Sequence, residues 1–376
     1  MKKRILLASP HMSDEGYEQQ YIKEAFDTNW IAPLGENVNK FEEEIAKYIG
    51  AKTGAALSAG TAAIHMGLKA LEVQQGDLVF CSSLTFSATC NPIIYQNARP
   101  VFIDSEYETW NMDPKALEQA FEKYPNPKAV LVVNLYGTPA KLDEILEICK
   151  KHNTPVIEDA AESLGATLND KQTGTFGEFG IYSFNGNKII TTSGGGMLVS
   201  NNVEKIKKVR FWSTQSREPE RHYEHKEIGY NYRMSNICAG IGRGQLKVLD
   251  KRIEKKTKIY ETYQKLFKDI PEIKMQPYLE KSKPNHWLSA ILLDENSKIK
   301  PLDIIVALEK ENIESRPIWK PMHLQPVFEN CDFITTAKQG SNSQDIFERG
   351  VCLPSDTKMT EEEQEKVIKI IKNLFI

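Results

Sequence analysis

Residues 129–159 read AVLVVNLYGTPAKLDEILEICKKHNTPVIED, with a helical pattern between two short apolar runs. In the helical part, Leu142, Ile145, Leu146 and Cys149 share one face, as expected for a helix that packs on one side. The two apolar runs are nearly continuous, which is typical of strands buried on both faces. This order predicts a strand, a helix and a second strand parallel to the first.

The same alternation extends in both directions, from about residue 50 to residue 200. Seven β-like runs lie in this region: AALS (55–58), DLVFCS (77–82), RPVFID (99–104), AVLVVN (129–134), TPVIED (154–159), GIYSF (180–184) and GGMLVS (195–200). One of the helical stretches between them opens with Asp113 as N-cap and Pro114 at its first position. The pattern predicts an α/β fold with a mainly parallel seven-stranded sheet flanked by helices.

The rest of the chain predicts a smaller second domain. A helical region runs from about 202 to 268 and is interrupted by the loop 216–236. After it come a β-like run (286–293), a helical run (301–313) and a final helix from about 360. Two more helices are expected at about 14–28 and 37–49. We therefore predict a large domain over 1–250, which includes the N-terminal helices, and a small C-terminal α/β domain over 251–376.

Charge and cysteine content argue against several classes of function. The formal net charge is −3, so no basic surface for a nucleic acid is expected. No run of about eighteen apolar residues occurs, so no transmembrane helix is expected. The six cysteines form no CxxC pair and no zinc-binding pattern with histidines. We expect reduced thiols in a cytoplasmic protein without a bound metal and without a nucleic-acid or membrane partner.

A candidate catalytic lysine lies in FGIYSFNGNKIITTSGGGMLVS, residues 179–200. Lys188 occupies a polar turn between two β-like runs, and the usual interpretation of such a lysine is a solvated surface residue. Here many hydroxyl and amide side chains flank it, and Gly194–Gly196 permits close approach of the backbone to another group. A lysine in a partly closed pocket can form an imine with an aldehyde cofactor.

Two acidic residues, Glu158 and Asp159, end one of the predicted strands. Ligands bind at the carboxyl ends of the strands in open α/β sheets. A buried carboxylate needs a cationic or hydrogen-bonding partner, and a protonated pyridine nitrogen would be one. A helix N-cap or a salt bridge is an equally good interpretation at this point.

A candidate phosphate site lies in SAGTAAIHMGL, residues 58–68. An apolar run ends in small residues there, and a helix is expected to begin at Gly60 and Thr61. The free N–H groups at a helix N-terminus suit a phosphate. An ordinary turn from strand to helix remains the alternative.

Together these segments resemble the sugar nucleotide aminotransferases of the DegT/StrS group, which are fold-type-I pyridoxal-phosphate enzymes. The resemblance covers essentially the whole chain, and its motifs occur in order: WIAPLG (30–35), SAGTAAIHMGL (58–68), SLTFSATCNPI (83–93), NLYGTPAKLDEI (134–145), EDAA (158–161), SFNGNK (183–188), GGG (194–196), YNYRMSN (230–236), RPIWKPMH (316–323) and CLPS (352–355). Some relatives carry histidine in place of the lysine and perform dehydration. Lys188 therefore favours amino transfer.

The resemblance implies roles for the residues that match its motifs. Lys188 would bind pyridoxal 5'-phosphate as a Schiff base and then move a proton between cofactor and substrate carbons. Asp159 would pair with the pyridinium nitrogen. The other implied cofactor contacts are Gly60, Thr61, Ser183 and, from the second subunit, Asn231 at the phosphate, Phe86 stacked on the ring, and Glu162 beside it. Relatives commonly carry Gln or Glu at this last position.

The resemblance also implies a substrate site and a substrate. The site would be lined by Asn29, Trp30, Ile31, Ala32, Arg316, Pro317, Ile318 and Trp319, with His323 as either a ligand contact across a dimer or a packing residue. The chain most resembles bacterial enzymes that make UDP-4-amino-4,6-dideoxy-N-acetylglucosamine in the bacillosamine and exopolysaccharide pathways. The expected reaction moves an amino group from L-glutamate to the 4-keto carbon of a UDP-linked 4-keto-6-deoxy-N-acetylhexosamine, in a homodimer with shared active sites. A TDP-linked or 3-keto sugar is the alternative.

Two other classes of function were compared with this one. The segment GTFGEFG, residues 174–180, has glycines three apart, as in the dinucleotide-binding loop of an oxidoreductase or epimerase. It does not open a helix after the first strand, which that fingerprint requires. A cofactor-binding regulator without turnover is the other possibility, and the pair Lys188 and Asp159 argues against it.

Overall fold

The protein is described here from a computed structural model that covers residues 4–376, so the first three residues of the predicted large domain lie outside the described residues. Its main feature is an eight-stranded sheet in the order β1-β9-β8-β5-β4-β2-β3-β14. The strands are β1 (Thr53–Leu57), β2 (Leu78–Ser82), β3 (Arg99–Ile103), β4 (Ala129–Val133), β5 (Val156–Asp159), β8 (Phe179–Ser183), β9 (Gly196–Ser200) and β14 (Asp332–Ile334). Most of their residues are buried, as in sheets covered on both faces.

All seven strands expected between residues 50 and 200 are present, and the predicted count of seven is corrected to eight. The additional strand is β14, which pairs in parallel with β3 and covers the edge that β3 would otherwise expose. With three residues it is too short to produce a readable pattern in the sequence. Strand β9 pairs antiparallel with both β1 and β8, whereas the other pairings in this sheet are parallel.

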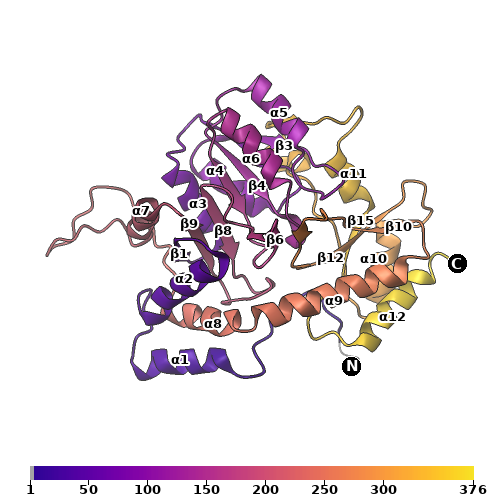
Figure 1. The fold of residues 1–376 in the computed structure, drawn as a ribbon, viewed down its shortest axis with the longest axis horizontal. Coiled ribbons are helices and arrows are strands. Elements are labelled where there is room, and N and C mark those ends of the chain that lie inside the picture. Colours follow the sequence, from indigo (N-terminus) through magenta and orange to yellow (C-terminus); the bar gives the residue numbers. More distant parts are fainter. Residues whose placement is uncertain (1–3) are drawn as a thin grey trace.

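Helices cover the main sheet, as Figure 1 shows. They include α3 (Gly60–Ala70), α4 (Asn91–Tyr95), α5 (Pro114–Lys123), α6 (Leu142–Lys151) and α7 (Val203–Ser213). Helix α5 begins as expected, because the Asp113 side chain accepts a hydrogen bond from the Lys115 backbone N–H. In α6 the fully buried positions include Ile148, whereas Leu146 is only partly buried. The predicted apolar face is therefore shifted slightly toward Ile148.

The N-terminal helices α1 (Tyr17–Asp27) and α2 (Glu36–Ile49) pack on α8 (Asn236–Leu246). Buried Glu42 of α2 accepts a hydrogen bond from the Ala56 backbone and forms ion pairs with Arg210 and Arg233, so α2 is fixed against β1. Helix α9 (Leu249–Phe267) then runs from α8 toward the C-terminal part of the chain (Figure 1). The loop between α7 and α8 projects away from the rest of the molecule.

The C-terminal part forms a second, antiparallel sheet in the order β10-β12-β15-β13. Its strands are β10 (Ile273–Met275), β12 (Ser289–Leu293), β13 (Arg316–Pro317) and β15 (Gly350–Leu353), accompanied by α10 (Pro301–Lys310), α11 (Asn342–Arg349) and α12 (Glu361–Lys372). A third, small sheet joins β11 (Ser282–Lys283) to β6 (Thr167–Leu168) and β7 (Lys171–Gln172). Strands β11 and β14 lie in the predicted small domain but pair with strands of the predicted large domain. The division at residue 250 therefore stays a proposal.

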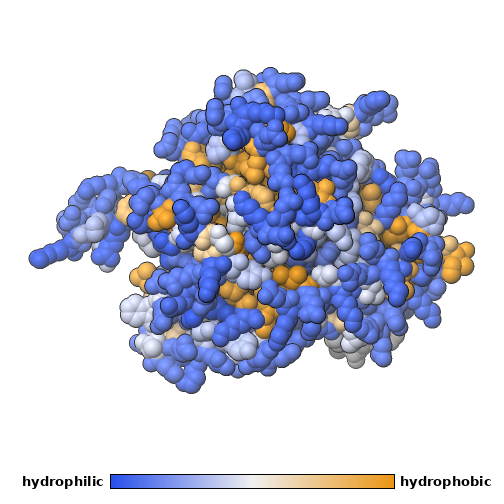
Figure 2. All heavy atoms as spheres, viewed as in Figure 1, coloured by the Kyte–Doolittle hydropathy of each residue, from blue (hydrophilic) through white to orange (hydrophobic). Residues whose placement is uncertain are grey.

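The face of the molecule shown in Figure 2 is mostly hydrophilic, with apolar side chains gathered in patches across its middle. Several large apolar side chains are exposed in the described chain, among them Trp30, Ile31, Phe86 and Ile228. The helices of residues 4–376 include none that is both long and apolar enough to span a membrane.

Candidate active site

The turn that carries Lys188 is fixed by backbone hydrogen bonds between β8 and β9. The Phe184 N–H donates to the Gly195 carbonyl at 2.9 Å, and the Lys188 N–H donates to the Asn185 carbonyl at 3.0 Å. Its polar residues therefore form an ordered loop at the carboxyl end of β8. Within this loop the Lys188 side chain is only 12% exposed, so the interpretation as a solvated surface lysine is not supported.

Two side chains from distant parts of the sequence meet the Lys188 amine. Glu162 Oε1 lies 3.5 Å from Lys188 Nζ, and the centre of the Trp287 ring lies 4.2 Å from the same atom. The second Glu162 oxygen accepts a 2.7 Å hydrogen bond from the Tyr136 backbone N–H. Burial raises the pKa of Glu162 to about 7, while the nearby charge of Lys188 lowers it. The carboxyl group therefore titrates near neutral pH, next to the amine.

Asp159 belongs to the same cluster. It ends β5, and its side chain accepts hydrogen bonds from the Thr89 hydroxyl at 2.7 Å and from the Ala161 backbone N–H at 3.1 Å. Burial raises the pKa of Asp159, and the positive charge of Lys188 partly opposes that rise. Strands β5 and β8 are parallel neighbours, so Asp159 at the end of β5 and the Lys188 turn after β8 both lie at the carboxyl end of the sheet.

The neighbouring acid, Glu158, has a different role. Successive side chains of a strand point to opposite faces, so Glu158 points away from Asp159. It is fully buried and accepts hydrogen bonds from the backbone N–H groups of Gly174, Phe176 and Gly177. This carboxylate fixes the segment before β8. That segment opens no helix, which agrees with the argument against a dinucleotide-binding loop.

A candidate phosphate cradle lies beside the lysine. Helix α3 begins at Gly60, as expected, after Ala59 in extended conformation. A Cβ atom on Gly60 would lie 3.2 Å from the Ser183 Cβ, and one on Gly196 would lie 2.4 Å from the Gly60 nitrogen. The first turn of α3, with Thr61, thus lies directly against Ser183 and the β9 backbone. Free N–H groups and a hydroxyl in one place suit a phosphate.

Aromatic side chains form a wall that continues from the lysine. The Trp287 ring lies 6.3 Å from both Tyr136 and Trp319, measured between ring centres. Trp319 in turn lies 5.5 Å from Phe86. Phe86 is 55% exposed, so one end of this wall is accessible to a ligand. The predicted residues Phe86 and Trp319 are therefore joined to the Lys188 cluster.

Among the other predicted site residues, Ile318 shares the apolar core of Trp287 and Tyr136, whereas the rest, apart from His323, are exposed in the described chain. Arg316 is exposed and paired with Glu314 at 2.8 Å, Pro317 is exposed, and Ile318 is buried in the core. The segment Asn29, Trp30, Ile31 and Ala32 is exposed, and Asn236 holds the carbonyls of Trp30 and Ala32. Asn231 is exposed beside Thr214.

His323 has packing partners within its own chain. Its Nδ1 lies 2.7 Å from the Ser83 hydroxyl, and its ring stacks on Phe333 at 3.7 Å. Burial lowers the pKa of His323 to about 4, so the imidazole is neutral at physiological pH. These contacts fit the interpretation as a packing residue, and the ligand contact across a dimer stays a prediction.

Sequence reasoning missed four residues that shape the cluster: Thr89, Tyr136, Asn285 and Trp287. Thr89 and Tyr136 lie inside motifs already quoted, but no local pattern showed that one would bind Asp159 and the other Glu162. Asn285 donates to the carbonyls of Glu162 and Leu164 at 2.8 and 2.9 Å. Asn285 and Trp287 come from the C-terminal part, so only the folded chain brings them to the lysine.

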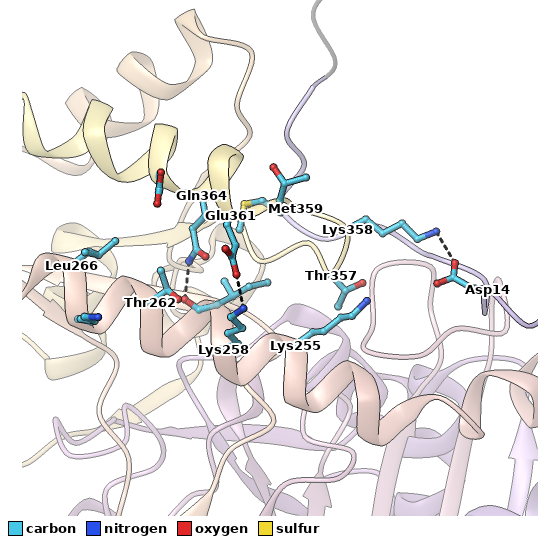
Figure 3. Close-up of a pocket in the computed structure, with 14 residues that line it drawn as sticks. Asp14, Lys255, Lys258, Thr262, Leu266, Thr357, Lys358, Met359, Glu361 and Gln364 are labelled. Carbon is cyan, nitrogen blue, oxygen red and sulfur yellow. Dashed lines mark hydrogen bonds and ion pairs between the residues drawn. The ribbon is translucent and has the colours of Figure 1, made fainter.

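A cavity of about 800 Å³ lies away from this cluster, between α9 and the segment that leads into α12 (Figure 3). Lys258 and Lys358 point across it to Glu361 and Asp14. These pairs are exposed, and exposed ion pairs contribute little. In residues 4–376, no group of three or more His, Cys, Asp or Glu side chains is placed to bind a metal ion.

Comparison with known families agrees with this geometry. The profile of the DegT/DnrJ/EryC1/StrS aminotransferase family matches residues 13–372. The chain belongs to this family. Among its members, EpsN of Bacillus subtilis (strain 168), a proposed pyridoxal phosphate-dependent aminotransferase, is 54% identical over 100% of this chain and 97% of its own.

The names of two further relatives in the DegT/DnrJ/EryC1/StrS family contain different nucleotides, GDP in one and UDP in the other. GDP-perosamine synthase of Caulobacter vibrioides is 34% identical and covers 99% of both chains. UDP-4-amino-4,6-dideoxy-N-acetyl-beta-L-altrosamine transaminase of Campylobacter jejuni is 36% identical over 69% of this chain and 70% of its own.

Solved structures show the same fold. A DegT DnrJ EryC1 StrS aminotransferase from Brucella abortus superposes with a TM-score of 0.88 at 27% identity, over 96% of this chain and 95% of that one. The PLP-form of Spr1654 from Streptococcus pneumoniae, a proposed sugar aminotransferase, gives a TM-score of 0.90 at 23% identity, over 99% and 98% of the two chains. The protein is thus a pyridoxal-phosphate-dependent sugar aminotransferase. The amine, the buried carboxyl groups and the helix N-terminus described above fit that cofactor.

Proposed function

We propose that the protein transfers an amino group from L-glutamate to the 4-keto carbon of a UDP-linked 4-keto-6-deoxy-N-acetylhexosamine, with Lys188 as the catalytic lysine. The products would be UDP-4-amino-4,6-dideoxy-N-acetylglucosamine and 2-oxoglutarate. The observation that carries the proposal is the buried cluster of Lys188, Glu162 and Asp159 at the carboxyl end of the sheet.

In this proposal each part of the cofactor would have a partner in the cluster. Lys188 would hold the aldehyde carbon, and Asp159 would face the ring nitrogen. A protonated ring nitrogen would supply the cation that the buried Asp159 carboxylate needs. The N-terminus of α3 with Gly60 and Thr61, together with Ser183, would hold the phosphate. Phe86 and Glu162 would lie beside the ring.

The residues of this chain would then act on protons and on orientation. Pyridoxal phosphate, when bound, supplies an aldehyde that condenses with amines and a ring that withdraws electrons. Lys188 would carry a proton between the carbon atoms of cofactor and substrate. Glu162 lies 3.5 Å from the lysine, and its pKa is raised to about 7, so it would exchange a proton with the lysine or hold its charge.

The substrate part of the proposal is supported by likeness to relatives. EpsN, at 54% identity, is a proposed pyridoxal phosphate-dependent aminotransferase, and the Campylobacter jejuni relative is a transaminase of a UDP-linked amino sugar. A second candidate is a GDP-linked keto sugar, because GDP-perosamine synthases from three bacteria are 34% identical over most of the chain.

We further propose that the protein acts as a cytoplasmic homodimer with shared active sites. Trp30, Ile31 and Ile228 are 52%, 50% and 79% exposed, and such apolar side chains gain free energy when a partner covers them. The site also has an open side next to Phe86. A second copy would bring Asn231 to the phosphate and would complete the sugar nucleotide site with Asn29–Ala32.

The decisive experiment is incubation of the purified protein with pyridoxal phosphate, L-glutamate and a panel of UDP-, GDP- and TDP-linked 4-keto and 3-keto sugars. Mass spectrometry then identifies any amino sugar formed. We expect the UDP-linked 4-keto N-acetyl sugar to react with the highest kcat/KM. A higher value for a GDP- or TDP-linked sugar would overturn the substrate assignment, and no amine product from any sugar would overturn the proposal as a whole.

A further inference from the structure

Trp287 is held at three points where the C-terminal part of the chain reaches Lys188. Its backbone N–H donates to the Asn285 side chain at 2.9 Å. Its indole N–H donates at 2.7 Å to the carbonyl of Asn187, the residue directly before Lys188. Its ring, 2% exposed, lies over the Lys188 amine at 4.2 Å. A side chain fixed in this way defines where the amine can lie.

A further anchor of Trp287 is Lys256, a buried lysine on α9. Lys256 Nζ donates to the Trp287 carbonyl at 2.9 Å and also to the Ser355 carbonyl. The side chain is buried, and burial lowers the pKa of Lys256 to about 7. Asp356 opposes that shift and Arg252 adds to it. Burying an amine costs free energy unless the amine is hydrogen-bonded. The two carbonyl contacts of Lys256 offset this cost, and one of them fixes the backbone of Trp287.

We propose that Trp287 is a positioning residue that holds the Lys188 amine in place and favours its charged form, and that Lys256 acts on Lys188 through Trp287. The proposal rests on the assignment of Lys188 as the catalytic lysine. The face of an indole ring attracts a cation, whereas Glu162 and Asp159 are the ionisable groups that face the same amine.

The first test compares two substitutions that leave a similar gap, Trp287→Phe and Trp287→Leu. Both lose the hydrogen bond to Asn187, but only phenylalanine keeps an aromatic face. In cofactor-free protein, competitive acetylation over a range of pH with peptide mass spectrometry gives the pKa of the Lys188 amine. We expect a value lower by about half a pH unit in the leucine variant than in the phenylalanine variant. Equal values would overturn the proposal. If the leucine variant does not fold, Trp287→Met takes its place.

The second test separates positioning from a direct charge effect. Lys256→Met should lower the pKa of Lys188 in the wild-type background and leave it unchanged in the Trp287→Leu background. Loss of a nearby positive charge acting through space would instead raise it. Either a rise, or an equal shift in both backgrounds, would overturn the role of Lys256. Lys255→Met, an exposed neighbour on the same helix, is the matched control and should change nothing.

Failure of this inference is distinguishable from failure of the proposed function. Borohydride treatment of the cofactor-loaded wild-type protein, followed by peptide mapping, identifies the lysine that binds the aldehyde. A label on Lys188 together with equal pKa values in the two Trp287 variants would reject only the positioning role. A label on another lysine would reject the assignment of Lys188 itself.

Discussion

The Thr89 hydroxyl donates a 2.7 Å hydrogen bond to Asp159, and both side chains are buried. A buried carboxylate with neutral donors keeps an unbalanced negative charge. Burial accordingly raises the pKa of Asp159. A cation beside Asp159 would therefore be stabilised, and the protonated ring nitrogen of the cofactor would be such a cation.

Lys188→Ala should reduce amino transfer by at least about a hundredfold, because general acid–base catalysis contributes roughly that much or more. The variant should fold normally and should no longer be labelled by borohydride at this position. Product formation measured by mass spectrometry tests the prediction, with the exposed Lys310→Ala variant as control. Normal turnover by Lys188→Ala would contradict the assignment.

Asp159→Asn should weaken activity strongly while leaving the cofactor-free protein as stable as the wild type or more stable. The amide keeps hydrogen-bonding capacity toward Thr89 but removes the buried charge. Thermal unfolding of the cofactor-free protein and the dissociation constant of pyridoxal phosphate are the measurements. A large loss of stability without loss of cofactor affinity would show that Asp159 serves the fold alone.

Glu162→Gln should change how stability depends on pH. The pKa of Glu162 is raised from an ordinary 4.5 to about 7 in the folded protein, so the folded state binds more protons than the unfolded state between these values. The wild-type protein therefore loses stability as the pH rises from about 4.5 to 7. Relative to it, the cofactor-free Gln variant should gain about 1–3 kcal/mol across this window. Parallel pH profiles in urea unfolding would contradict the prediction.

Ser183→Ala should weaken cofactor binding by about tenfold or more, because a hydrogen bond to a charged group contributes about 1.5–3 kcal/mol. Ser183 lies against Gly60 at the start of α3. Titration of the cofactor-free protein with pyridoxal phosphate measures the change, and the exposed Ser193 provides a matched Ser→Ala control. Unchanged affinity would place the phosphate elsewhere.

Mixing two inactive variants should restore activity if the active sites are shared. A Lys188→Ala chain paired with an Asn231→Ala chain would form one intact site and one site with both defects. After complete exchange of subunits, about a quarter of all sites should be intact. Recovery of that fraction supports the dimer, whereas recovery of none, with exchange verified by native mass spectrometry, would place both residues in one subunit's site.

The strands and helices around the site could be predicted because each follows from a local pattern. The seven runs between residues 50 and 200, the Asp113 cap and the start of α3 at Gly60 all depend on neighbouring residues. Resemblance then placed Lys188, Asp159 and Glu162 at the end of that sheet. The profile match over residues 13–372 confirms the family, while the roles of these residues stay predictions.

What the sequence did not reveal depends on contacts between distant segments. Trp287 is 99 residues after Lys188 and lies in a stretch without a distinctive motif, yet its ring covers the amine. Strand β14 contains only three residues and pairs with β3, more than 200 positions earlier. No periodicity within a short window can report such pairings, because the partners are chosen by the folded chain.

The pairing of β14 with β3 has a consequence for how copies of this protein meet. At the opposite end of the sheet, the backbone of Arg233 bridges Leu57 of β1, so β3 and the end of β1 are each flanked by a segment of the same chain. An uncovered outer strand invites another molecule to extend the sheet by main-chain pairing. Strand β3 is therefore closed to such pairing in the complete chain, and a fragment that ends before residue 332 should be more prone to fibrous aggregation.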